Sequence, residues 1–310
     1  MRSPSAPAAL AAAAGALGIT GVLLAAALGG AHDIAVWVRL VADLAGMLTL
    51  GLAALPLLTE DRATTGDRCL APLAVVAGLW AAGGAAQTAV SAAQRVGVSV
   101  LRVDVGALAD VVRSGAGVVL STVVALVLAL WAAVVLLRGS SAPAPTVAVP
   151  LAVLGLIAGP ATGHLSLTDV GSILVSAHVA AAAWWCGTLA AMALVLRGRG
   201  QWAQALPRFS SLALWAVALV GATGVTSALL HSTDFGAAYL RVAIAKLLVL
   251  VLLVGLGWHQ RRTWLAAASR RGIDEKAWGI DEKASMLRAI LEVGAITVAF
   301  GLAASLSLTA

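Results

Sequence analysis

Three short segments of the sequence each pair a histidine with an aspartate and contain no lysine or arginine. An imidazole beside a carboxylate, with no cation nearby, suits a metal ion such as copper, zinc, iron or nickel. Each pair can also be read as ordinary helix-end and turn residues, and that alternative stays open. The pairs are His32 with Asp33, His164 with Asp169, and His231 with Asp234.

A fourth histidine, His178, lies inside a long apolar run. An ionisable side chain is costly there and marks a candidate functional residue. The alternative is a neutral imidazole that only hydrogen-bonds to the backbone of a neighbouring helix. Cys186 follows eight positions later, about 12 Å along a helix, and is a candidate for a deeper metal ligand on the same path. A lone buried cysteine also serves as a small apolar filler.

The amino-acid composition indicates the environment of these candidate residues. Of the 310 residues, 61% are apolar and 11% are charged, whereas a soluble domain carries about 25% charged residues. These values exclude a soluble or disordered protein and indicate an integral membrane protein. The net charge of +6 does not indicate nucleic-acid binding, because the basic residues lie in short gaps between apolar runs. The two cysteines form no CxxC motif, so neither a disulfide framework nor a cysteine zinc site is indicated.

The apolar runs predict an all-α fold, a polytopic transmembrane bundle of about nine helices. A helix needs about 20 apolar residues to cross a hydrocarbon core roughly 30 Å thick. Runs without period-2 alternation favour helices over a barrel. The first run could be a cleaved signal peptide, which would leave eight spans. The predicted spans are 8–29, 34–58, 70–93, 115–137, 146–163, 171–196, 209–231, 238–258 and 286–308.

The segments between the spans predict the orientation. Loops rich in lysine and arginine stay in the cytoplasm. With a cytoplasmic N-terminus and an external C-terminus, the external loops hold only Arg95, Arg102 and Arg113. All three histidine–aspartate pairs are then external. The external stretch 94–114 carries charges among valines, which predicts an amphipathic connector at the membrane surface rather than a tenth span.

Six further charged residues lie within predicted spans. Those spaced i,i+4 can neutralise each other on one helix face, but Lys246 has no such partner. Counted from the external helix ends, Asp43, His178 and Lys246 lie about 10 to 14 Å deep. We therefore hypothesise that they form one intramembrane polar cluster, with an ion pair that only fixes packing as the alternative. The six residues are Arg39 with Asp43, Arg241 with Lys246, and Arg288 with Glu292; the first and last pairs have i,i+4 spacing.

Several of these residues belong to an ordered series of motifs. The series runs through Thr162-Gly163-His164, His178 with Trp184-Trp185-Cys186-Gly187, Arg208-Phe209-Ser210, Thr223-Gly224-Val225, Tyr239-Leu240-Arg241 with Lys246, and Arg288 with Glu292. Over roughly 150–310 it resembles the copper resistance protein D (CopD) family of bacterial inner-membrane proteins. Two positions depart from the family pattern. Cys186 stands where an aliphatic residue is usual, and Thr188 stands where a second glycine is usual.

The resemblance implies an inner-membrane protein of copper homeostasis and resistance. Such a protein takes up copper toward the cytoplasm or delivers it for cuproprotein assembly, often beside a small periplasmic copper-binding partner. Copper is then the ion expected at the histidine and aspartate residues above. A single bundle over 1–310 would comprise less specific N-terminal helices at 1–138 and a CopD-like core at 146–310.

Other classes of function are weighed against this one. No GxxxxGK[ST] loop occurs, which excludes ATP-driven pumping within the chain. No nucleophile-and-base or paired-carboxylate arrangement is visible, so we do not expect an enzyme. Haem-based electron transfer would need axial histidines on facing helices, and only His178 is clearly intramembrane. A non-catalytic scaffold for cuproenzyme assembly remains an alternative.

Overall fold

The computed structural model describes residues 33–139, 147–162 and 169–230, together with residues 20, 23, 241, 244, 245, 247, 248, 250–252, 254 and 255. The chain divides into two compact units, Asp33–Asp234 and a second unit made of Met1–His32 and Phe235–Ala310. The three long described ranges all belong to the first unit.

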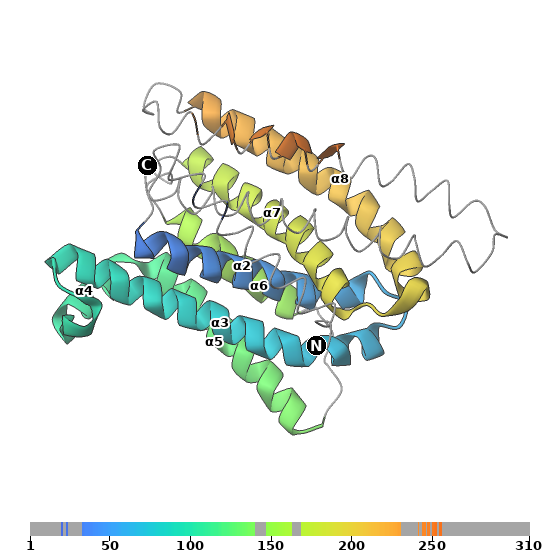
Figure 1. Cartoon of the computed structure of the whole chain (residues 1–310), viewed down its shortest axis with the longest axis horizontal. Coiled ribbons are helices and arrows are strands. Elements are labelled where there is room, and N and C mark those ends of the chain that lie inside the picture. Colours follow the sequence, from blue (N-terminus) through green and yellow to red (C-terminus); the bar gives the residue numbers. More distant parts are fainter. Residues whose placement is uncertain are drawn as a thin grey trace, which may run out of the picture. The chain divides into compact units, whose positions relative to one another are not determined.

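Every regular element in the described ranges is helical, as the sequence predicts (Figure 1). Among the described residues, five helices are long and apolar enough to cross a membrane: α2 extended by η1, then α3, α5, α7 and α8. Helix α6 is apolar but shorter. The elements are α2 (Ile34–Ala54), η1 (Leu55–Leu57), α3 (Arg62–Val96), η2 (Val100–Arg102), α4 (Val105–Ser114), α5 (Ala116–Leu137), α6 (Ala148–Ala161), α7 (Asp169–Val195) and α8 (Gly198–Leu230).

Six of the predicted spans coincide with these helices, but two helices begin well before the predicted span. Helix α3 begins at Arg62 because Asp61 caps it, its Oδ1 accepting the Thr64 N–H at 3.0 Å. Hydrogen bonding from Thr64 also lowers the pKa of Asp61. Helix α8 begins at Gly198, since the polar residues before 209 continue the helix beyond the apolar run. The predicted spans 8–29, 238–258 and 286–308 lie outside the described residues or have only a few positions described, so the count of nine remains a prediction.

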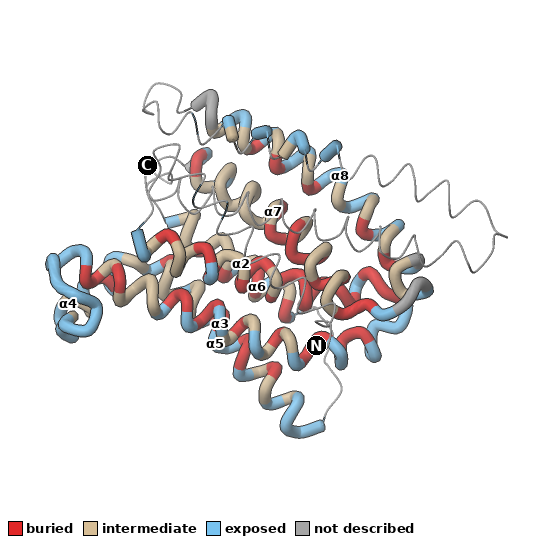
Figure 2. Tube along the Cα trace, viewed as in Figure 1, coloured by how far each residue is buried: buried red, intermediate tan, exposed pale blue. Residues whose placement is uncertain are grey.

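Helix α2 is the most buried of the five long helices and packs against α3, α6 and α7 (Figure 2). In its most apolar window 72% of residues are buried, against 22% for α5 and 28% for α7. Helices α2 and α7 run in the same direction (Figure 1) and meet at Gly51 and Gly187. A Cβ atom on Gly51 would overlap the Gly187 carbonyl, and one on Gly187 would overlap the Met47 carbonyl. Glycine is therefore required at this crossing, and the contact fixes the register of the two helices.

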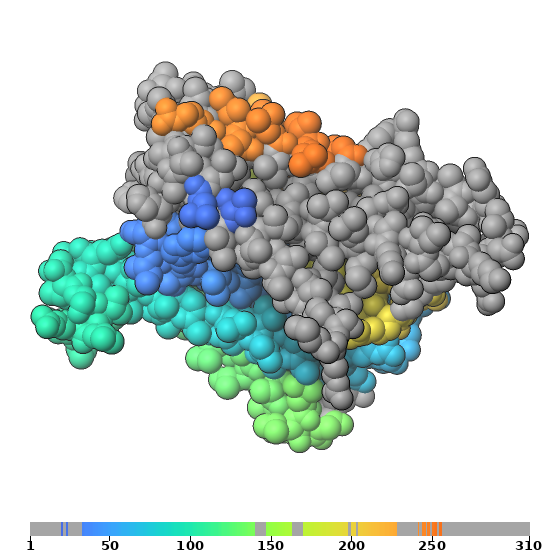
Figure 3. Space-filling model, in the orientation of Figure 1, coloured from blue at the N-terminus to red at the C-terminus, as the bar shows by residue number. Residues whose placement is uncertain are grey.

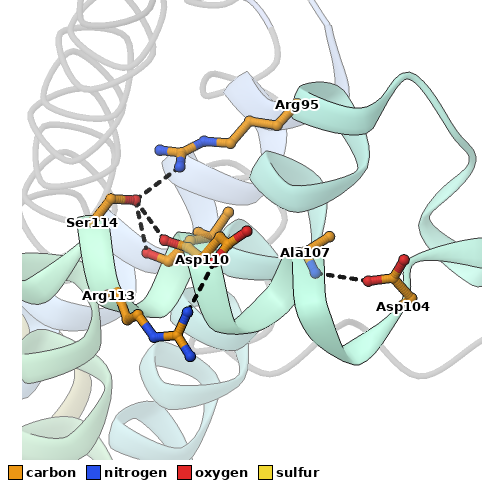
Figure 4. A network of polar contacts seen from close by, with 7 residues as sticks. Arg95, Asp104, Ala107, Asp110, Arg113 and Ser114 are labelled. Carbon is orange, nitrogen blue, oxygen red and sulfur yellow. Dashed lines mark hydrogen bonds and ion pairs between the residues drawn. The ribbon is translucent and has the colours of Figure 1, made fainter.

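The predicted connector between α3 and α5 is present as the short helix α4 with its flanking turns. Figure 3 shows it beyond the end of α3, with an uncovered surface. Asp104 caps α4 by accepting the Ala107 N–H at 2.7 Å, and Arg95 donates to Ser114 at 2.8 Å, which joins the two ends of the connector (Figure 4). Leu101 is 97% exposed and Val105 is 82% exposed. The connector thus combines a polar network with uncovered apolar side chains.

Candidate functional site

His178, the predicted intramembrane histidine, contacts helix α8. Its Nδ1 lies 3.0 Å from the hydroxyl oxygen of Thr223, in a partly buried position. Thr223 itself is only 4% exposed. The contact joins α7 to α8 through two polar side chains inside candidate membrane spans. This contact is with a side chain, and both interpretations of His178 drawn from the sequence stay open.

The hydrogen bonds of Thr223 define which atom of this pair donates. The Thr223 hydroxyl donates to the Leu219 carbonyl at 2.6 Å, with the Val220 carbonyl at 3.2 Å. A hydroxyl has one proton, and an oxygen–oxygen distance this short places that proton on the line to Leu219. With that proton engaged, the Thr223 oxygen is available as an acceptor, which favours the tautomer of His178 with its proton on Nδ1. In a neutral imidazole the basic lone pair is consequently on Nε2.

Gly224 of α8 lies beside the His178 ring. A Cβ atom at Gly224 would lie 3.6 Å from Cε1 of the imidazole, which is ordinary van der Waals contact. The ring is therefore bounded on one side by the α8 backbone and is held there by the hydroxyl of Thr223. Thr223 thus contributes the hydrogen-bond partner, whereas an alanine in place of Gly224 would also fit beside the ring.

Asp43 lies on α2 at nearly the same level as His178. It precedes the α2–α7 glycine contact by eight residues and His178 precedes that contact by nine, which is about 12 and 14 Å along the parallel helices. The predicted i,i+4 pair is confirmed, because the Arg39 Nε lies 3.6 Å from an Asp43 carboxylate oxygen. Lys246 lies outside the described residues, so the cluster of Asp43, His178 and Lys246 remains a prediction.

Asp33 has a structural role at the start of α2. One carboxylate oxygen accepts the N–H groups of Ala35 and Val36 at 3.1 and 3.3 Å, and the other accepts from the Gln94 side chain at 2.9 Å. A helix cap and a link to α3 thus occupy both oxygens of this predicted metal ligand.

The other predicted site residues fall into three groups. Cys186 is buried on α7 with no disulfide partner, and its role as a deeper ligand remains a prediction. Asp169 begins α7, but only its backbone is described, while Arg241 is helical and belongs to the second unit. Within the described ranges, no three histidine, cysteine, aspartate or glutamate side chains gather as a metal site. The predicted residues outside the described positions are His32, His164, His231, Asp234, Lys246, Arg288 and Glu292.

Two further residues of α8, Arg208 and Phe209, make contacts that were not predicted. The Arg208 guanidinium donates to the Leu58 carbonyl at 3.1 Å and lies 3.7 Å from the Glu60 carboxylate, which ties the start of the apolar part of α8 to the turn between α2 and α3. Phe209 stacks on Trp184 of α7, with ring centroids 6.0 Å apart. The sequence signals Arg208, Phe209 and Thr223 only as members of motifs, without indicating their partners.

These features define a class of protein. In the described part of the chain, five membrane-length apolar helices and a polar contact between two of them indicate a multi-pass helical membrane protein. Residues 203–306 match the model of the CopD family, copper resistance protein D, and the predicted resemblance is confirmed over those residues. No curated protein and no solved structure matches the chain.

The matched segment is narrower than the predicted range of 150–310. It begins within α8 and includes Arg208, Phe209 and Thr223, but not His164 or His178. The hydrogen bond between His178 and Thr223 therefore connects the matched segment to the motif that precedes it. The family name implies a role in copper resistance.

Proposed function

We propose that this protein takes up copper across the bacterial inner membrane, with His178 as a ligand for the ion in transit. The hydrogen bond between His178 and Thr223 is the observation that carries the proposal, because it joins an imidazole inside a membrane helix to the segment that matches copper resistance protein D. Imidazole is a good copper ligand, and the deduced tautomer has its lone pair on Nε2.

The position of His178 suits an ion in passage. Asp43 lies at a similar level on the neighbouring helix α2, although its carboxylate is engaged by Arg39. A carrier must hold its ion loosely enough to release it, so a few ligands arranged in series suit transport better than a closed cage. His164 and the other external histidines would be the first ligands that the ion meets, and a periplasmic copper-binding protein would supply it.

Cellular copper content tests this function. A deletion strain is complemented with wild type, His178→Ala, His164→Ala and Ser176→Ala, with equal protein levels verified in membranes. Ser176 is on α7, two residues from His178, and serves as the matched control. We expect His178→Ala to accumulate as little copper as the deletion strain, and Ser176→Ala as much as wild type.

Other outcomes identify the alternatives. Wild-type copper accumulation by His178→Ala would overturn the assignment of His178. Unchanged copper content on deletion of the gene would overturn uptake and favour a scaffold for cuproenzyme assembly. A Soret band in the purified protein would point instead to haem.

A further inference from the structure

We propose that Thr223 is a positioning residue that holds His178 in the Nδ1–H tautomer, so that copper binds through Nε2. The inference rests on the proposed function, since it specifies how that ligand is presented. It assigns a role to a residue of α8 that the sequence motifs name without explaining.

The Thr223 hydroxyl is oriented by its own helix, independently of the histidine. Its proton is directed to the Leu219 carbonyl at 2.6 Å, in the i−4 arrangement that threonine adopts within helices. A threonine side chain in a helix divides between two rotamers according to such backbone bonds. The bond to Leu219 therefore selects the rotamer and turns the oxygen lone pairs outward.

That fixed acceptor discriminates between the two forms of the neutral ring. At 3.0 Å, Nδ1 of His178 must bring a proton to the Thr223 oxygen, because two unprotonated acceptors would repel each other. The opposite tautomer could keep a hydrogen bond here only by taking the Thr223 proton away from the Leu219 carbonyl, and a flipped ring loses the contact. Metal-binding histidines commonly donate their second ring nitrogen to an oxygen, which orients the ring and raises the basicity of the ligating nitrogen.

A purely structural role for the pair makes a different prediction. If the hydrogen bond only joined α7 to α8, its removal would lower stability without altering the histidine tautomer or the intrinsic affinity for copper. Thr223→Val keeps the shape of the side chain and removes the acceptor, whereas Thr223→Ser keeps the acceptor. Thr226→Val is the matched control, because Thr226 makes the same i−4 bond, to Ala222 at 2.9 Å, in an exposed position.

The experiment uses the full chain in lipid nanodiscs and two measurements. Solid-state ¹⁵N spectra of histidine-labelled protein, with the His178 signals assigned from His178→Gln, report which ring nitrogen is protonated. Competition with a chromophoric chelator gives the affinity for Cu(I). We expect Nδ1–H in wild type, mixed tautomers in Thr223→Val, and an affinity loss of about 10- to 100-fold in that variant. Thr223→Ser and Thr226→Val should remain close to wild type.

The results of these measurements separate the possible failures. An Nε2–H tautomer in wild type would overturn the inference even if Thr223→Val could not be purified. Wild-type copper affinity and tautomer in folded Thr223→Val would overturn it as well. If His178→Gln binds Cu(I) like wild type, His178 is not the copper ligand and the proposed function is wrong on that point. If His178→Gln loses affinity for Cu(I) but Thr223→Val does not, only the role of Thr223 is overturned.

Discussion

Gly51 of α2 and Gly187 of α7 meet backbone against backbone, and this contact sets Asp43 and His178 at one level of the bundle. A side chain at either position would strike a carbonyl group rather than a side chain that can move aside. We expect Gly187→Ala to lower the free energy of unfolding by about 1 to 3 kcal/mol, the usual cost of overpacking.

Thermal unfolding in a mild detergent measures this loss. Gly78→Ala is the matched control, because a Cβ atom at Gly78 of α3 would meet nothing within 4 Å. Alanine is favoured over glycine inside a helix by about 0.5 to 1 kcal/mol, so the control should be neutral or stabilising. Equal stability of Gly187→Ala and Gly78→Ala would contradict the close α2–α7 crossing.

Arg208 joins α8 to the turn after α2, and its removal should loosen that junction. Hydrogen bonds to charged groups contribute about 1.5 to 3 kcal/mol when well buried. The Arg208 side chain is 48% exposed, so we expect a smaller loss, about 1 kcal/mol, in Arg208→Ala. Faster proteolysis between α2 and α3 would report the change. Arg138→Ala controls for the loss of a loop charge, and identical digestion of the two variants would count against the junction.

The α4 connector should lie at the membrane surface with Leu101 in contact with lipid. Its uncovered apolar side chains adjoin the ends of two candidate spans, α3 and α5, whereas the Asp110–Arg113 pair is exposed on α4. A fluorophore attached at Leu101→Cys, in a background without the native cysteines, should emit at shorter wavelength in nanodiscs than one at Arg113→Cys. Identical, water-like emission from both sites would place the connector away from the bilayer.

The cap of α3 should weaken in acid. The pKa of Asp61 is lowered in the folded protein, so the carboxylate stabilises the fold above its unfolded pKa, and that stability is lost as the pH falls through the folded value. The amide side chain of the Asp61→Asn variant can still cap the helix but does not titrate. Wild type should therefore lose stability relative to Asp61→Asn as the pH falls below about 4, the ordinary range of the group. Parallel pH profiles of the two proteins would contradict this account.

The helices could be predicted from sequence because a bilayer leaves few alternatives for an apolar run. The ends of the helices were less predictable, because hydropathy indicates which residues lie in the membrane and not where the helical backbone begins. The polar first turns of α3 and α8 show this. His178 was identifiable as an ionisable residue in an apolar run. Thr223 was not identifiable, because a threonine in a membrane helix can donate its hydroxyl proton to a carbonyl of its own helix. Its pairing with His178 depends on how α7 and α8 are rotated about their axes.

Asp33 shows a second limit of prediction. Aspartate before an apolar run is typical of a helix cap as well as of a metal ligand. The contact with Gln94, 61 residues further along the chain, depends on how α2 and α3 are arranged. A pattern of residue types alone could not decide between these roles.

Copper entry into proteoliposomes is the measurement that tests the central claim most directly. Full-length protein is reconstituted, Cu(I) is supplied outside, and the metal inside is quantified over time. Wild type and Ser176→Ala should fill the vesicles, whereas His178→Gln should do so no faster than vesicles without protein. Entry at the wild-type rate through His178→Gln would contradict the role of His178 as the copper ligand within the membrane.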